Sequence, residues 1–288
     1  MNTFSTTIAW QACFCAVGLA LSASATAQDA ATPAPAAAVE GTSGHAGFIW
    51  ALGVTANNGA NYAGSNRRGT GIGHVVGVAL GRYTLSTGGG GTLLDRDLDR
   101  TESGVSARLV DHGRLRLTGS LRFGGGRTAG DEPQLQGLPE IRRTLRGRIG
   151  VVYDASDNWS FRSAITQDLL GRAGGAVLNN TARYEFDLPP GTELALVAGL
   201  QLADKTYMRS FFGVSEALAG VTTPLPAFAP RAGWHSAEVG LDWRQNVSHH
   251  WVLLGGLRYT QLHGDARRSP LTLKPDNYSV SLGLVYRY

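Results

Sequence analysis

The sequence has little of what would mark a disulfide-bonded protein, a helical membrane protein or a nucleic-acid-binding protein. Its only two cysteines, Cys13 and Cys15, both lie within the first 27 residues. No run of 18 apolar residues follows that segment, so the sequence offers no candidate for a transmembrane helix. The formal net charge is a mild +4, and the arginines are spread along the chain. This distribution excludes the clustered basic face that nucleic-acid binding requires.

The first 27 residues also lack Lys, Arg, Asp and Glu altogether. Their apolar stretch ends in small residues that include Ala25 and Ala27, which is typical of a secretory signal peptide and its cleavage site. We therefore expect residues 1–27 to be removed, leaving a chain with no thiol chemistry. The Ala/Pro-rich residues 28–44 lack periodicity and predict a flexible segment. Residues 45–288 are long enough for one all-β domain.

The rest of the sequence is rich in alternation with a period of two, which indicates β-strands with unlike faces. Residues 114–124 place Leu and Phe on one face and Arg, Thr and Ser on the other. Residues 278–288 place Tyr, Val and Leu opposite Ser, Gly and Arg up to the final residue. A terminal strand with one apolar face needs a neighbour along its whole length, which a closed sheet in lipid provides.

The connections alternate between short and long. Short polar turns at 111–113, 154–158, 188–191 and 246–249 separate longer segments such as 204–233, the longest of them. This alternation is typical of an outer-membrane β-barrel, with short periplasmic turns and longer external loops. We predict a closed antiparallel transmembrane β-barrel in the outer membrane of a Gram-negative bacterium. Twelve strands are expected, with ten as the alternative, near residues 46–56, 71–79, 82–87, 103–110, 114–124, 141–153, 158–169, 177–187, 192–203, 234–245, 250–263 and 277–288.

Two groups of residues follow from this barrel. The terminal aromatics Tyr286 and Tyr288 are expected in the periplasmic aromatic girdle, as a C-terminal assembly signal. Charged residues on the polar faces are expected to line the lumen, either as a packed interior of ion pairs or as the wall of an anion-favouring pore. These lumen charges are Arg114, Arg116, Arg122, Arg146, Arg148, Arg162, Arg183, Glu185, Glu238, Asp242, Arg244 and Arg258.

Three stretches carry a resemblance to a known family. They are "NYAGS" at 61–65, "DKTYMRSFFGVSEALA" at 204–219 and "HHWVLLGGLRYTQLHGDARRSPL" at 249–271. With "DLLGR" at 168–172, they make the chain resemble the MltA-interacting MipA/OmpV family of outer-membrane proteins over nearly its whole length. Two positions depart from the family's pattern, Ala60 where proline is frequent and Arg268 where an acidic residue is frequent. The motif residues are Tyr62, Gly64, Ser65, Tyr207, Phe212, Gly213, Val214, Ser215, Gly264, Asp265, Ser269 and Pro270.

The resemblance implies a function as well as a fold. The family's namesake is described as a scaffold between a lytic transglycosylase and a penicillin-binding protein, while other members are treated as porin-like or adhesive. We therefore expect a monomeric, non-catalytic scaffold linked to peptidoglycan (murein) enzymes, with no cofactor. The alternative is a narrow porin-like channel.

An interfacial lipid hydrolase is the more distant alternative. His263 and Ser269 lie near one loop with Asp265 between them, and a nucleophile and its base need hydrogen-bond reach. Asp95, Asp97 and Asp99 alternate as calcium ligands do, but the expected Gly and Glu of a calcium loop are missing, so we expect no metal. Within the longest connection, residues 208–220 predict one amphipathic helix that faces the barrel mouth.

Overall fold

The computed structural model describes residues 48–87, 103–130 and 132–288. Twelve antiparallel strands form one closed barrel, in which each strand pairs with its neighbours in sequence and β12 pairs with β1. The barrel and the count of twelve are confirmed, and the alternative of ten strands is wrong. The strands are β1 (Phe48–Ala60), β2 (Arg68–Leu80), β3 (Tyr83–Thr87), β4 (Ser103–His112), β5 (Leu115–Gly124), β6 (Thr144–Asp154), β7 (Trp159–Asp168), β8 (Ala176–Glu185), β9 (Thr192–Ala203), β10 (Gly233–Asn246), β11 (Trp251–Leu262) and β12 (Asp276–Arg287).

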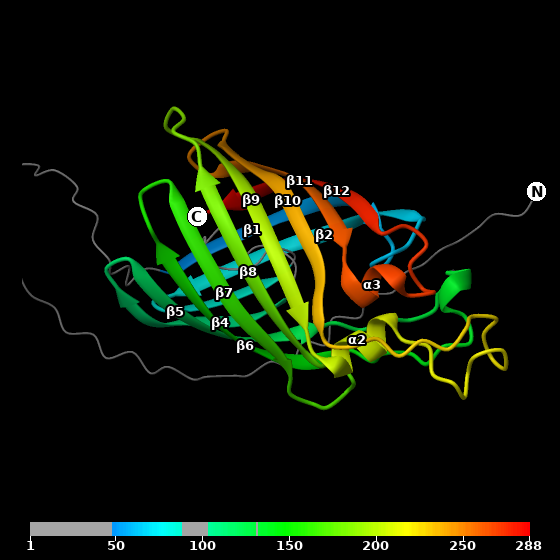
Figure 1. Ribbon diagram of the computed structural model, residues 1–288. Coiled ribbons are helices and arrows are strands. Elements are labelled where there is room, and N and C mark those ends of the chain that lie inside the picture. The colour runs from blue at the N-terminus through cyan, green and yellow to red at the C-terminus, as the bar shows by residue number, and fades with distance from the viewer. Residues whose placement is uncertain (1–47, 88–102, 131) are drawn as a thin grey trace, which may run out of the picture. The chain divides into compact units, whose positions relative to one another are not determined.

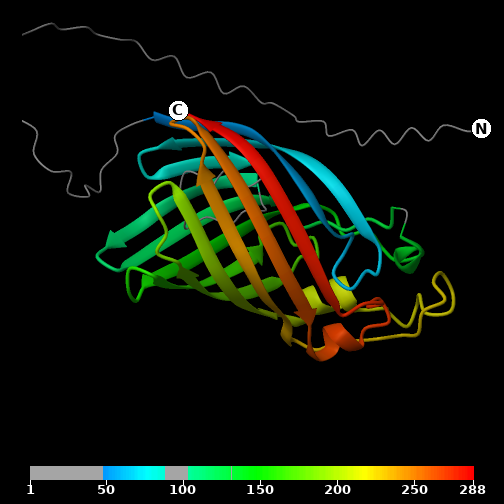
Figure 2. The same ribbon diagram turned by 90° about the horizontal axis from the view of Figure 1, so that it is seen from above.

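Closure of the barrel explains the terminal strand. Residues 280–287 of β12 pair in register with residues 51–58 of β1, and the other edge of β12 pairs with β11. Figure 2 shows β12 in red beside β1 in blue. Beyond the last strand residue, Tyr288 still exchanges backbone hydrogen bonds with Trp50, at 2.9 and 3.2 Å. Neither edge of the last strand is left bare, as a lipid environment requires.

The outer face of the barrel is apolar and the inner face is mixed. On β12, Val280, Leu282 and Leu284 are 42–54% exposed, whereas Val285, which points into the lumen, is fully buried. The strand period of two places these residues on opposite faces, as the alternation predicted. Exposed aliphatic rows recur on the other strands. The exterior therefore suits contact with lipid.

Three short helices complete the described chain, namely η1 (Pro133–Leu135), α2 (Lys205–Phe212) and α3 (Gly264–Arg268). All three belong to the long loops, and α2 and α3 gather at one end of the barrel, opposite the end where the C-terminus lies (Figure 1). No helix in the described ranges is long and apolar enough to cross a membrane. The expected signal peptide, the 28–44 segment and the Asp95–Asp99 alternation lie outside the described residues.

Candidate functional site

Helix α2 forms the base of a cap at the long-loop end. Asp204 caps its N-terminus, because the carboxylate accepts a hydrogen bond from the Tyr207 amide at 2.7 Å. Met208 and Phe212 lie four residues apart and therefore share one face. Both are about 1% exposed, and they pack with the inward-facing Val177, Ala203 and Leu262 at the ends of β8, β9 and β11. The helix thus covers the inner rim of this part of the barrel mouth.

The helix differs in extent from the one predicted over 208–220. It begins at Lys205 and ends at Phe212. Gly213 adopts an extended conformation, and Val214 forms a β-bridge with Phe228. The amphipathic period continues past Gly213, but Val214 instead exchanges backbone hydrogen bonds with Phe228, at 2.9 and 2.8 Å. The prediction was wrong for residues 213–220 because no local signal reveals this partner.

Ser269 ties the third family stretch to the end of α2. Its hydroxyl donates to the carbonyl of Phe212 at 2.6 Å and accepts from the Leu271 amide at 3.1 Å. Ser269 is 3% exposed. The carbonyl of the next residue, Pro270, accepts from Gln134 at 2.7 Å. A helix C-terminus leaves carbonyls without intrahelical partners, and this serine satisfies one of them.

These contacts bear on the hydrolase alternative. The His263 ring stacks on Trp234, with 4.0 Å between centroids, while Ser269 is held by Phe212 and Leu271. In the part of the chain that the structure describes, His263 and Ser269 share no hydrogen bond. No group of three or more His, Cys, Asp or Glu side chains suited to a metal occurs there either. The His–Ser pair expected of a hydrolase is therefore not formed.

The first loop of the chain joins the same cap. Tyr62 donates its hydroxyl to the carbonyl of Leu271 at 2.9 Å. Burial, with a smaller contribution from the Glu132 carboxylate, raises the pKa of Tyr62 to about 12, so the hydroxyl stays a donor. The carbonyl of Gly64 accepts from the amides of residues 273 and 274 at 2.8 and 2.9 Å. Gly64 has φ of +97°, which a side chain would disfavour. The Ser65 carbonyl accepts from Asn277 at 3.3 Å.

The 125–143 loop supplies contacts that the sequence gave no reason to expect. Arg127 donates to the carbonyl of Phe211 at 2.8 Å, and burial lowers its pKa. Leu135 on η1 packs with Val214 and Leu271 in an apolar cluster that includes Tyr62. This loop carries no recognisable motif. Its length alone, which is unusual for a connection, was the available signal.

His235 is another residue of the cap region that the sequence gave no reason to expect. A β-bulge between Trp234 and Ser236 turns its ring toward α2. The ring is 4% exposed and lies 5.3 Å from the Tyr207 ring and 6.0 Å from the Phe212 ring, centroid to centroid. Strict alternation cannot predict this position, because a bulge shifts the register by one residue.

Asp265 closes the cap from the side. It lies in the first turn of α3. Its carboxylate accepts hydrogen bonds from the Arg231 amide at 2.9 Å, from the Arg231 guanidinium at 3.3 Å, and from Arg268. These hydrogen bonds, the Arg231 amide first, hold the pKa of the Asp265 carboxyl well below its usual range. The preceding Gly264 has φ of +54°. Arg268, which departs from the family pattern, therefore contacts the motif aspartate directly.

The motif residues thus converge on one structure, which we call the cap. It consists of residues 61–67, 125–130, 132–143, 204–232 and 263–275. Tyr207 is half-buried on α2, Gly213 ends that helix, and Ser215 is exposed just beyond it. The cap offers packing and hydrogen bonding, and its motif side chains are occupied in holding loops together.

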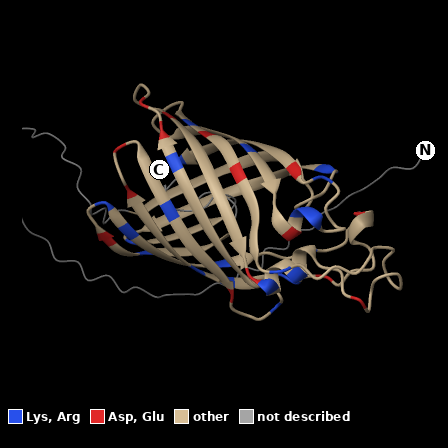
Figure 3. Cartoon of the chain, viewed as in Figure 1, with Lys and Arg blue, Asp and Glu red and all other residues tan. Residues whose placement is uncertain are grey.

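The lumen charges form a second candidate site. Asp242 bridges Arg183 and Arg258 at 3.1 Å each, Arg244 lies 3.8 Å from Glu193, and Arg116 pairs with Asp154. Figure 3 shows basic and acidic residues along the strands. Arg122 and Arg146 are direct partners across β5 and β6. Arg148 follows two residues later on β6, and Arg162 on β7 lies opposite Val152, four residues beyond Arg148. Glu185 and Glu238 occupy inward positions on β8 and β10. The prediction that Arg114 lines the lumen was wrong. This residue is exposed in the turn before β5, where it donates a hydrogen bond to the Ala155 carbonyl.

The opposite end of the barrel carries short turns and clustered rings. Tyr286 and Tyr288 lie 5.6 and 6.0 Å from the Trp50 ring, and His250 stacks on both tyrosines. Trp251 meets Tyr286 edge-on at 5.4 Å. A second group joins Trp159, Phe161, Tyr184 and Phe186. Such a band of outward aromatic rings is typical of a membrane interface.

The chain is similar in overall fold to several solved outer-membrane proteins. No curated protein matches the sequence. Among solved structures, a NanC porin is 10% identical, covering 81% of this chain and 98% of its own, with a TM-score of 0.41. The outer membrane channel DcaP of Acinetobacter baumannii is 8% identical, covering 87% and 100%, with a TM-score of 0.39. A Pseudomonas aeruginosa FadL homologue is 10% identical, covering 84% and 90%, with a TM-score of 0.40. The barrel assignment rests on the strand pairing itself.

The family comparison covers nearly the whole barrel. Residues 52–288 match the family described as MltA-interacting protein MipA. This range includes each of the three loop stretches on which the resemblance rested and the charged lumen positions. The chain therefore belongs to the MltA-interacting protein MipA family.

Proposed function

We propose that the protein is a non-catalytic scaffold of the outer membrane, which binds a periplasmic murein enzyme through its short-turn end. The observation that carries this proposal is the cap: α2 covers the inner rim of β8, β9 and β11 with two fully buried side chains. A mouth covered in this way suits an anchor better than an open conduit. The family's name adds a partner of the lytic transglycosylase class.

The binding surface belongs on the face that looks into the periplasm. With long loops outside and short turns inside, as outer-membrane barrels are oriented, that face carries the turns at 113–114, 155–158, 186–191 and 247–250. Asp111, Asp157 and His249 offer charged or polar contacts there. Trp159 and Trp251 are 43% exposed and sit beside these turns, where they serve either the membrane boundary or a partner.

The test is co-purification from the outer membrane. In one variant the residues of the four turns are replaced by others, while Trp159 and Trp251 are kept so that the girdle is intact. We expect it to fold, as shown by a mobility shift on heating in SDS, and to lose its periplasmic partners. A matched control carries Ser269→Ala and His263→Ala and should retain them. A turn variant that keeps every partner while the control loses a lipid-hydrolysing activity overturns the scaffold in favour of the enzyme.

A narrow channel is the second candidate, because of one specific observation. Arg122 and Arg146 are direct partners across β5 and β6, and Arg148 and Arg162 occupy further inward positions on β6 and β7. Rings of arginine set anion selectivity in pores. Planar-bilayer recording of the purified barrel separates the two functions, since the capped scaffold should show no steady conductance. Steady anion-selective current, lost in Arg148→Gln, supports the channel instead.

A further inference from the structure

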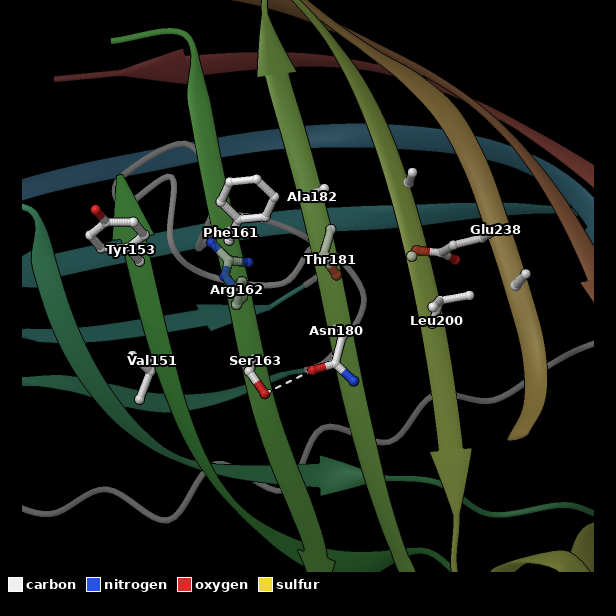
Figure 4. Close-up of a pocket in the computed structure, with 13 residues that line it drawn as sticks. Val151, Tyr153, Phe161, Arg162, Ser163, Asn180, Thr181, Ala182, Leu200 and Glu238 are labelled. Carbon is white, nitrogen blue, oxygen red and sulfur yellow. Dashed lines mark hydrogen bonds between the residues drawn. The ribbon is translucent and has the colours of Figure 1, made fainter. Parts of the chain in front are cut away.

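The outer wall of the barrel is hollowed across β7–β10. Ser163, Ala182, Ala198 and Ala237 are small side chains at outward positions of these four strands. Together they leave a groove of about 640 Å³ in the face that meets lipid (Figure 4). Phe161 flanks the groove on the β7 side and is 46% exposed. On β12, the large side chains of Val280, Leu282 and Leu284 fill the corresponding row.

The groove contains a polar pair that lipid cannot satisfy. The Ser163 hydroxyl donates to the Asn180 amide oxygen at 2.9 Å, drawn as a dashed line in Figure 4. Asn180 is midway along β8, between Ala176 and Glu185, and therefore at the depth of the hydrocarbon. Within the described residues, no acceptor pairs with the amide nitrogen of Asn180. Whichever way the amide is turned, one of its polar ends remains unpaired in an apolar medium, which is unfavourable.

The chemistry of this pair indicates the occupant. Acyl chains carry no hydrogen-bonding group at the bilayer centre, so a lipid cannot pair with the free end of the Asn180 amide. A second copy of the same chain presents an identical amide at an identical depth, because both copies insert into one membrane with the same orientation. An amide is both donor and acceptor, so two of them pair across a two-fold axis. We propose that the β7–β10 groove is a homodimer interface in which the Asn180 amides of two copies bond to each other.

The relief of the surface supports the same arrangement. A two-fold axis along the membrane normal places the β7 side of one copy against the β9 and β10 side of the other. Phe161 of each copy then faces the hollow at Ala198 and Ala237 of its partner. Small residues allow two membrane-embedded backbones to approach closely, and polar side chains hold them together. The proposed dimer differs from the monomer expected from the sequence, because alternation shows which side chains face lipid but not the hollows and ridges that they form.

Disulfide trapping in the membrane tests the proposal. In a full chain with Cys13→Ser and Cys15→Ser, Ala182→Cys places a thiol in the groove. Leu284→Cys is the matched control, because it lies two residues before Tyr286 as Ala182 lies two residues before Tyr184. We expect mild oxidation to convert most Ala182→Cys chains to a covalent dimer and few Leu284→Cys chains. If Ala182→Cys does not assemble, Leu178→Cys, on the same row of β8 at the other side of Asn180, serves in its place.

A second measurement tests the role of the amide. The dimer dissociation constant, measured by sedimentation in detergent micelles, should rise about 3- to 20-fold in Asn180→Leu, the range expected for a hydrogen bond between membrane segments. Equal trapping at the groove and control positions overturns the proposal. So does a cross-link to a different protein, or a monomer that retains a bound lipid in the groove. None of these outcomes bears on the scaffold function, which depends on the turns.

Discussion

The two ends of the barrel are built on different principles. At the long-loop end, the cap is held by side chains that reach backbone groups far away in sequence, such as Ser269 to Phe212 and Tyr62 to Leu271. At the short-turn end, local turns suffice, and stacked rings such as Trp50 on Tyr288 mark the boundary. Long loops have more conformational entropy to lose, so they need tertiary hydrogen bonds and a core of their own. The cap should therefore unfold without the barrel.

The largest expected effect comes from the core of the cap. Phe212→Ala removes a fully buried ring from the contact between α2 and the strands, at a cost of about 3–5 kcal/mol. We expect hydrogen exchange to accelerate throughout 204–232, while the barrel strands stay protected. Val221→Ala is the matched control, because Val221 is 78% exposed on the same loop. If protection is lost evenly over cap and barrel, the two ends are one cooperative unit.

A smaller effect is expected from one hydrogen-bonding side chain. Ser269→Ala removes only the hydroxyl and leaves the Phe212 carbonyl and the Leu271 amide unpaired, at about 1–3 kcal/mol. Limited proteolysis should then cut the 204–232 loop faster than in the natural protein. Ser215→Ala, at an exposed position just after α2, should leave the cutting rate unchanged. An unchanged rate in Ser269→Ala would show that other contacts hold the cap.

At the short-turn end, Tyr288→Asp should lower the free energy of unfolding by about 1 kcal/mol. The cost is small because a charged side chain near the membrane interface stays close to water. The backbone pairing of Tyr288 with Trp50 survives the substitution, while the ring contact is lost. Assembly should nevertheless fall more than this energy implies, if the terminal aromatic is recognised during insertion. The measurement is the amount of heat-modifiable barrel in outer-membrane fractions, with Tyr288→Phe as the control. Normal levels of the aspartate variant would refute the assembly role.

The mildest effect is a pH dependence confined to the cap. The pKa of Asp265 is lowered in the folded state, so its contribution to stability is complete above the unfolded carboxyl pKa of about 3.9. That contribution is lost as the pH falls through the lower folded value. Hydrogen exchange at 263–275, corrected for its intrinsic pH dependence, should therefore show weaker protection below about pH 4 and constant protection from pH 5 to 8. Asp265→Asn should remove this acid dependence, and a variant that keeps it would assign the dependence to another group.

The sequence by itself determined the barrel. A period of two shows which side chains face lipid, and the alternation of short and long connections gives the antiparallel order of the strands. The same pattern led us to expect Tyr286 in the aromatic girdle, and its ring contacts Trp50 and Trp251. The motif residues were recognisable in sequence, although nothing local indicated that Tyr62, Phe212 and Ser269 lie in one cap.

Only the tertiary structure decided how the long loops pack together and where the outer surface of the barrel is hollowed. The buried ring of His235 and the bonds from Arg127 and Gln134 depend on partners tens of residues away, and the extended chain after α2 depends on its bridge to Phe228. The groove around Asn180 depends on which small side chains four strands bring together. Strand periodicity is a local property of the chain, whereas loop packing and surface relief arise from contacts between distant segments, and for that reason they could not be predicted.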